Sequence, residues 1–145
     1  MPGRLQKVAE NPLVLADGAH NPDGVRVLAQ SLAAVDLPRP VIGVLAIMRD
    51  KDYPEMLRRF RPLLNGVVCT QASEARSLTA AELAGAVTAA AARRDRGGCS
   101  EPLVEPCPKV ALERARAAAG PEGAVLVGGS LYLLEDLREE LGAGV

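Results

Sequence analysis

Four short, uninterrupted apolar runs are the feature of this sequence that most constrains its fold. Each run is three to seven residues long and is bounded by turn-forming residues, as is typical of strands buried on both faces. Segments with apolar residues at helical spacing lie between the runs. Alternating strands and helices predict an α/β fold, in which a mainly parallel sheet carries helices on both faces. The predicted strands are Leu13–Ala16, Val41–Ile47, Val67–Cys69 and Ala124–Val127.

Capping residues mark where two of the helices begin. Asn21 and Pro22 are a typical N-cap and first helical residue. Thr79 and Glu82 form a capping box in front of an alanine-rich segment with high helix propensity. The expected helices are Pro22–Ala33, a segment around Met56–Leu64, Ala80–Ala92, Pro108–Ala119 and Leu131–Leu141.

The N-terminal segment predicts a hairpin. The apolar runs Leu5–Ala9 and Leu13–Ala16 flank Glu10-Asn11-Pro12, which is a turn signal. Farther along, the polar, glycine-bearing stretch Arg93–Ser100 predicts a surface loop. Because no linker is long enough to divide the chain, we expect a single domain over residues 1–145.

Composition narrows the classes of function. Aromatic residues make up only 2% and the formal net charge is -1, so no basic or base-stacking surface for nucleic acid is expected. No apolar run is long enough to span a bilayer, and residues 1–4 lack the apolar core of a signal peptide, so we expect a cytoplasmic protein with no membrane partner. The three cysteines have the wrong spacing for a disulfide framework or a zinc site, and we expect Cys69 in the core.

Polar residues follow the first predicted parallel strand. In such sheets ligands bind outside the carboxyl ends of the strands. Asp17 lies there and can accept hydrogen bonds from ribose hydroxyls, while His20 and Asn21 stand at a helix start that attracts anions. The alternative is that Asp17 and Asn21 only satisfy the backbone of the turn and that His20 is an ordinary surface residue.

Two later strand ends carry further candidates. Lys51, between Asp50 and Asp52, can bind a carboxylate or phosphate; alternatively the three residues form a solvated loop in which Asp52 caps the next helix. Ser130, after two glycines, can bind a ligand or simply cap the last helix. Near the N-terminus, the side chain of Arg4 is either solvated or binds an anion. The sequence has neither a P-loop motif nor a Gly-x-Ser-x-Gly elbow.

Five motifs, in order along the whole chain, give the sequence a specific resemblance. They are Pro2-Gly3-Arg4-Leu5, Asp17-Gly18-Ala19-His20-Asn21-Pro22, Asp50-Lys51-Asp52, Arg76-Ser77-Leu78 and Gly129-Ser130-Leu131-Tyr132-Leu133. Together they resemble the C-terminal domain of folylpolyglutamate synthase, an enzyme often bifunctional with dihydrofolate synthase and part of the Mur ligase superfamily. The resemblance implies a Rossmann-like fold of the Mur ligase C-terminal type. It also implies that residues 1–145 are a fragment of a larger enzyme, whose N-terminal P-loop ATPase domain is absent here.

The resemblance further implies a reaction and a set of site residues. ATP phosphorylates the γ-carboxylate of a folate, and the amine of L-glutamate attacks the acyl phosphate to form an amide. Cofactors and substrates are then ATP, Mg²⁺ held mainly by the N-terminal domain, L-glutamate and folate. The implied residues are Arg4, Asp17, His20 and Asn21 for ATP and Lys51, Ser130 and Tyr132 for glutamate, with Arg4 and Lys51 also catalytic.

Two other functions stay open at this point. One is the C-terminal domain of another Mur-type ligase that acts on a peptidoglycan precursor or on cyanophycin. The other is a non-catalytic nucleotide-binding module. On the leading hypothesis the isolated domain has no turnover, because its main partner, the ATPase domain of the same enzyme, supplies the rest of the site.

Overall fold

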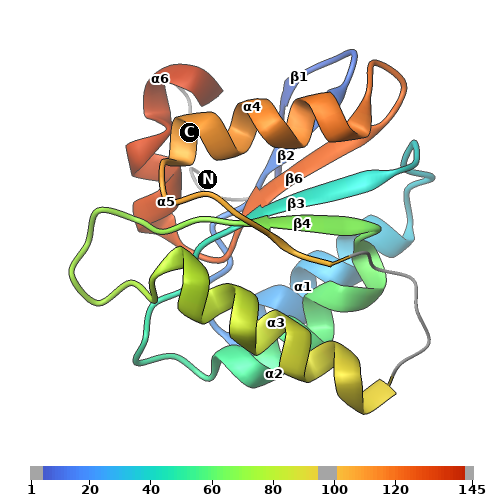
Figure 1. The fold of residues 1–145 in the computed structure, drawn as a ribbon. Coiled ribbons are helices and arrows are strands. Elements are labelled where there is room, and N and C mark those ends of the chain that lie inside the picture. The colour runs from blue at the N-terminus through green and yellow to red at the C-terminus, as the bar shows by residue number, and fades with distance from the viewer. Residues whose placement is uncertain (1–4, 95–100, 143–145) are drawn as a thin grey trace.

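A six-stranded sheet runs through the middle of the molecule in the order β1-β2-β6-β3-β4-β5 (Figure 1). The computed structural model describes residues 5–94 and 101–142. The first two strands pair antiparallel, and every other neighbouring pair is parallel. The predicted α/β fold with an N-terminal hairpin is therefore confirmed. The strands are β1 (Gln6–Ala9), β2 (Leu13–Ala16), β3 (Val41–Leu45), β4 (Gly66–Cys69), β5 (Leu103–Val104) and β6 (Ala124–Gly128).

Helices cover both faces of this sheet. Helices α1, α2 and α3 lie on one face and α4, α5 and α6 on the other (Figure 1). None of the helices in the described part of the chain has the length and apolarity needed to cross a membrane. The helices are α1 (Pro22–Ala33), α2 (Tyr53–Phe60), α3 (Ala80–Arg94), α4 (Pro108–Ala119), α5 (Leu131–Asp136) and α6 (Arg138–Leu141), with a 3₁₀ turn, η1 (Arg61–Leu63), after α2.

Side chains of the central strands alternate between two apolar cores. In β3 and the segment after it, Ile42 and Val44 face the core under α4 to α6, while Val41 and Leu45 face the core under α1 to α3. This alternation follows from the two-residue period of a strand. Because both faces are covered, the strand reads as a continuous apolar run in the sequence, and Cys69 in β4 is buried as expected.

Four boundaries differ from the sequence predictions. The strand predicted over Val41–Ile47 ends at Leu45, and the helix predicted to reach Leu64 changes to η1 after Phe60. The last helix is not continuous, because Leu137 leaves helical geometry (φ -101°, ψ 15°) where its side chain is fully buried. The third helix continues to Arg94, so the predicted loop at 93–100 begins later; residues 95–100 lie outside the described residues.

Candidate functional site

The carboxyl ends of β2, β6 and β3 meet at one edge of the sheet, since these strands are adjacent and parallel. Backbone hydrogen bonds join the segments that leave them. The Asp17 N–H donates to the Val127 carbonyl oxygen at 3.0 Å, and the Ala46 N–H donates to the Gly128 carbonyl oxygen at 3.4 Å. The three loops that carry most of the predicted site residues therefore open on the same edge, which is where ligands bind in folds of this type.

The turn from β2 into α1 is held by its own side chains. Asp17 is buried, and its Oδ1 accepts a hydrogen bond from the Ala19 N–H at 2.7 Å. Asn21 is the N-cap of α1, as predicted, with its Oδ1 accepting from the Gly24 N–H at 2.7 Å. Both side chains thus do what the turn-backbone alternative predicted, and any contact with a ligand comes in addition to that role.

His20 stands half-buried in the same turn. Its Nδ1 lies 3.0 Å from the Gly18 carbonyl oxygen. When Nδ1 carries the proton and donates it to this carbonyl, Nε2 is left with the lone pair of the ring. The contact within the turn therefore orients the imidazole beside the start of α1.

Lys51 lies in the loop between β3 and α2, and the loop is fixed on both sides of it. The Lys51 N–H donates to the Met48 carbonyl oxygen at 3.2 Å, and Asp52 caps α2 by accepting from the Glu55 N–H at 3.3 Å, as predicted. Within the described residues, the Nζ of Lys51 forms no hydrogen bond or ion pair. Lys51 is thus a half-buried residue at this edge whose ammonium group has no partner among residues 5–94 and 101–142.

Ser130 is the N-cap of α5 and is almost fully buried. Its Oγ accepts hydrogen bonds from the N–H groups of Tyr132 at 3.0 Å and Leu133 at 3.4 Å. Gly129, just before it, has φ +99°, and a Cβ there would lie 2.5 Å from the Ala46 carbonyl oxygen. The tight turn therefore requires glycine. Ser130 mainly sets where α5 starts, with its hydroxyl proton still available to donate.

Arg76, for which no role beyond its motif was predicted, joins three loops at this edge. Its Nη1 donates to Asp50 Oδ2 at 3.2 Å, and its Nη2 donates to the Tyr132 hydroxyl at 3.0 Å. Its Nε is also 3.5 Å from Glu74 Oε2, and the hydrogen bond with Glu74 is the main reason that the pKa of Arg76 is raised. Only the match to Arg76-Ser77-Leu78 could have indicated this residue beforehand.

A second arginine fixes the Lys51 loop from the side of α3. Arg49 binds Glu82 through two hydrogen bonds, of 2.8 Å and 3.1 Å. The hydrogen bond from Arg49 and then the backbone N–H of Thr79 lower the pKa of Glu82 to about 2. Glu82 and Thr79 form the predicted capping box, with Thr79 N–H to Oε1 at 2.9 Å and Glu82 N–H to Oγ1 at 3.1 Å.

The structure thus places six of the seven predicted site residues at one edge of the sheet. Arg4, the seventh, lies outside the described residues. In the described part of the chain, no group of three or more His, Cys, Asp or Glu side chains is arranged to hold a metal ion.

Known proteins resemble this chain in sequence and in structure. The family model described as Mur ligase, glutamate ligase domain, matches residues 3–131. The dihydrofolate synthase/folylpolyglutamate synthase of Bacillus subtilis is 28% identical over 140 residues, which is 97% of this chain and 30% of that protein. This chain therefore spans less than a third of that curated relative.

Two solved structures share the fold over nearly the whole chain. Escherichia coli FolC in complex with DHPP and ADP has a TM-score of 0.83 and 26% identity, covering 97% of this chain and 31% of that chain. A bifunctional folylpolyglutamate synthase/dihydrofolate synthase with Mn, AMPPNP and L-glutamate bound has a TM-score of 0.76 and 26% identity, covering 97% of this chain and 32% of that chain.

Proposed function

This chain belongs to the Mur ligase family, whose glutamate ligase domain it matches, and we propose that it is the C-terminal domain of a folylpolyglutamate synthase. The whole enzyme would have an N-terminal P-loop ATPase domain as the partner of this domain. It would use ATP to phosphorylate the γ-carboxylate of a folate and then form an amide with the amine of L-glutamate. Such catalysis depends mainly on charge neutralisation and positioning.

The observation that carries this proposal is the shared edge formed by the ends of β2, β3 and β6. On the β2 side, Asp17, His20 and Asn21 surround the start of α1. We assign this side to the nucleotide, since a carboxylate suits ribose hydroxyls and a helix start suits an anion. The ADP and AMPPNP named with the two solved relatives support this choice.

The β3 and β6 side is assigned to the incoming amino acid. The ammonium group of Lys51 has no partner among the described residues. The α-carboxylate of an amino acid would form a charged hydrogen bond with it. Tyr132 is exposed and is held by Arg76, which places a second cation next to the same loop. Ser130 belongs to this pocket as the residue that positions Tyr132. The L-glutamate named with one solved relative supports the assignment.

The phosphoryl groups need cationic neighbours as well. We assign Arg4 to them, by its motif alone. Mg²⁺ would shield the charge of the phosphates, but the described residues offer no cluster of ligands that fits it. The ATPase domain is therefore the part of the enzyme to which we assign the metal. We also place the enzyme in the cytoplasm, without nucleic-acid or membrane partners.

The decisive experiment compares the full-length enzyme with this chain alone. The full-length enzyme should convert ATP, L-glutamate and a folate into ADP, phosphate and a product longer by one glutamate. The isolated chain should hydrolyse no ATP, because it lacks the P-loop. Ligation of a different acceptor, such as a peptidoglycan precursor, with no reaction on any folate would refute the proposal. Rapid ATP hydrolysis by the isolated chain would refute it too.

Within the full-length enzyme, Lys51→Met tests the proposed amino-acid side of the site independently of the nucleotide side. It should raise the KM for L-glutamate about tenfold or more, the usual effect of losing a charged hydrogen bond, with little change in the KM for ATP. Lys109→Met is the matched control, because Lys109 pairs with Glu140 on the opposite helix layer. An unchanged KM for L-glutamate in the Lys51 variant would show that Lys51 does not bind this substrate.

A further inference from the structure

Lys51 has an aspartate on each side in the sequence, yet within the described part of the chain its ammonium group pairs with neither. Opposite charges this close attract each other. Both aspartates, however, are engaged elsewhere. Asp52 accepts the Glu55 N–H at 3.3 Å and caps α2, and Asp50 accepts a hydrogen bond from Arg76 at 3.2 Å. The ammonium group is therefore left to a ligand because other groups hold the two neighbouring carboxylates.

Arg76 is fixed from several sides in the position where it binds Asp50. Its carbonyl oxygen accepts the Arg49 N–H at 2.6 Å, and its Nη2 donates to the Tyr132 hydroxyl at 3.0 Å. Its Nε lies 3.5 Å from Glu74 Oε2. A single exposed ion pair holds a side chain only weakly, whereas several contacts together fix the direction of a guanidinium. The pairing of Arg76 with Asp50 is therefore set by the surrounding loops.

Asp50 differs from the other carboxylates in these loops, because they are anchored in a second way. Glu74 also accepts the Arg76 backbone N–H at 3.1 Å, and Glu82 also accepts the Thr79 N–H at 2.9 Å. Among the described residues, the side chain of Arg76 is the one hydrogen-bond and ion-pair partner of the Asp50 carboxylate. Loss of the Arg76 side chain would therefore release Asp50, while Glu74 would stay attached to the backbone.

A released Asp50 would act directly on the proposed amino-acid side of the site. The two residues are adjacent in the chain, so the carboxylate could pair with the Lys51 ammonium group and compete with an incoming carboxylate. If it stayed unpaired, its charge would repel that carboxylate. Both effects weaken the binding of an anionic substrate and leave the nucleotide side unaltered.

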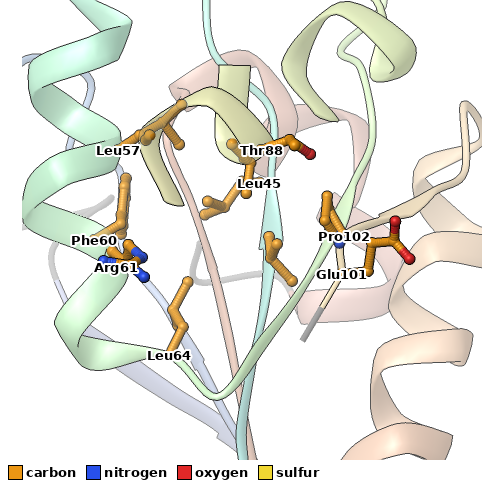
Figure 2. Close-up of a pocket in the computed structure, with 11 residues that line it drawn as sticks. Leu45, Leu57, Phe60, Arg61, Leu64, Thr88, Glu101 and Pro102 are labelled. Carbon is orange, nitrogen blue, oxygen red and sulfur yellow. The ribbon is translucent and has the colours of Figure 1, made fainter. Parts of the chain in front are cut away.

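The pocket between α2 and α3 is a poor alternative place for an anionic amino acid (Figure 2). Its volume is about 260 Å³, and its walls are largely apolar, with Leu45, Phe60 and Leu64 among them. The Nε of Arg61, the one arginine that lines it, is buried. A carboxylate against these walls would lose hydration, and Glu101 would repel it. The charged loops at the edge of the sheet suit such a substrate better.

We propose that Arg76 is a positioning residue for the amino acid: it binds Asp50 and thereby keeps the ammonium group of Lys51 available to the α-carboxylate of L-glutamate. Arg76 acts through Asp50 and Lys51 and does not itself need to touch the substrate. This inference rests on the proposed function, because it requires that Lys51 binds L-glutamate. It differs from a role in tying loops together, because it assigns the effect to the negative charge of Asp50.

The test is a double-mutant cycle in the full-length enzyme, with L-glutamate varied at saturating ATP and folate. Arg76→Met should raise the KM for L-glutamate about tenfold and leave kcat within about twofold, since the ground state and the transition state lose the same contact. Asp50→Asn should leave this KM within about twofold of the parent value, because no carboxylate is released.

The double variant decides between the two roles of Arg76. Arg76→Met combined with Asp50→Asn should return the KM for L-glutamate to within about threefold of the parent value. If Arg76 only tied the loops together, Asp50→Asn would break the same bond and could not restore binding. Thermal unfolding shows whether each variant is folded, and Arg76→Gln replaces a methionine variant that is not.

Glu74→Gln is the matched control for Asp50→Asn, because Arg76 binds both carboxylates and Glu74 keeps its backbone hydrogen bond. Combined with Arg76→Met, it should not restore the KM. An unchanged KM in Arg76→Met, an Asp50→Asn variant as impaired as Arg76→Met, no rescue in the double variant, or equal rescue by Glu74→Gln would each overturn the inference. A parent enzyme that ligates L-glutamate to no folate would instead refute the proposed function, so the activity of the parent distinguishes the two failures.

Discussion

Arg76 holds Tyr132 in two ways at once: its Nη2 donates to the tyrosine hydroxyl at 3.0 Å, and its guanidinium carbon lies 5.6 Å from the centre of the ring. The same guanidinium donates to Asp50, so one side chain sets the distance between the loop after β3 and the start of α5. These are the two segments to which we assign L-glutamate.

Removing this arginine should therefore loosen the proposed amino-acid pocket. In the full-length enzyme, Arg76→Met should lower kcat/KM for L-glutamate about tenfold, with a smaller change for ATP. Steady-state kinetics with each substrate varied in turn would measure this. Arg116→Met, on α4, serves as the control. Equal losses for ATP and L-glutamate would mean that Arg76 supports the whole edge rather than the pocket.

Asn21 can be tested for its two roles separately. Asn21→Ala should destabilise the chain by about 1 kcal/mol in urea unfolding, since it removes the cap of α1, and Asn21→Ser should restore most of that loss. In the full-length enzyme both variants should raise the KM for ATP if the amide also contacts the nucleotide. A normal KM for ATP in the serine variant would mean that Asn21 caps α1 and does not contact the nucleotide.

Glu82 should make stability depend on pH in the acid range. Its pKa is lowered from 4.5 to about 2 in the folded chain, chiefly by Arg49, so the folded state favours the ionised form. This stabilisation is complete above the unfolded pKa and disappears as the pH falls from 4.5 to about 2. Urea unfolding across this range should show a smaller loss for Glu82→Gln than for the parent chain. Glu113→Gln, on α4, should behave like the parent; an unchanged slope for Glu82→Gln would contradict the prediction.

Two glycine-to-alanine changes should have opposite signs. Gly129→Ala puts a Cβ 2.5 Å from the Ala46 carbonyl oxygen at φ +99°, so it should destabilise the chain by more than about 1 kcal/mol. Gly85→Ala in α3 meets no atom within 4 Å and should stabilise the chain by about 0.4–1 kcal/mol. Thermal unfolding of both variants is sufficient to compare them. A Gly129 variant as stable as the parent would show that the turn relaxes.

Leu126 should be among the most costly core residues to shorten. It is 1% exposed in the central strand β6, and Leu126→Ala should destabilise the chain by about 2–5 kcal/mol. Val27→Ala, on the exposed side of α1, should change stability by about 0.5 kcal/mol or less. Chemical denaturation measures both, and a small effect at Leu126 would mean that the core collapses around the gap.

Features set by neighbouring residues were predicted well from the sequence. Asn21, Asp52 and the Thr79–Glu82 pair cap their helices as predicted, because a cap needs only residues within one helical turn. The strand runs were found for a similar reason, since burial on both faces leaves an unbroken apolar segment. Ser130 was predicted as a possible cap and is one.

Features that depend on distant contacts were missed. The partners of Arg76 are 26 and 56 residues away in the sequence, and no local pattern indicates them. Strand β5 has two exposed residues, too few to show a period. The break at Leu137 has no signal in the sequence, where Leu131–Leu141 carries one continuous helical pattern. The binding roles assigned to Asp17, His20 and Lys51 remain predictions. The positions of these residues agree with the roles, but a position alone does not test whether a residue binds a ligand.

The position of β6 has a consequence for how the domain is made. Among the strands of the described residues this one comes last in sequence, yet it lies between β2 and β3 in the sheet. During synthesis, the N-terminal hairpin can therefore gain its native parallel strand partner only after Ala124–Gly128 has been made. In the folded sheet β6 alone joins the hairpin to β3, β4 and β5 among the described strands, so a chain that ended before Ala124 would lack the strand that connects these two parts.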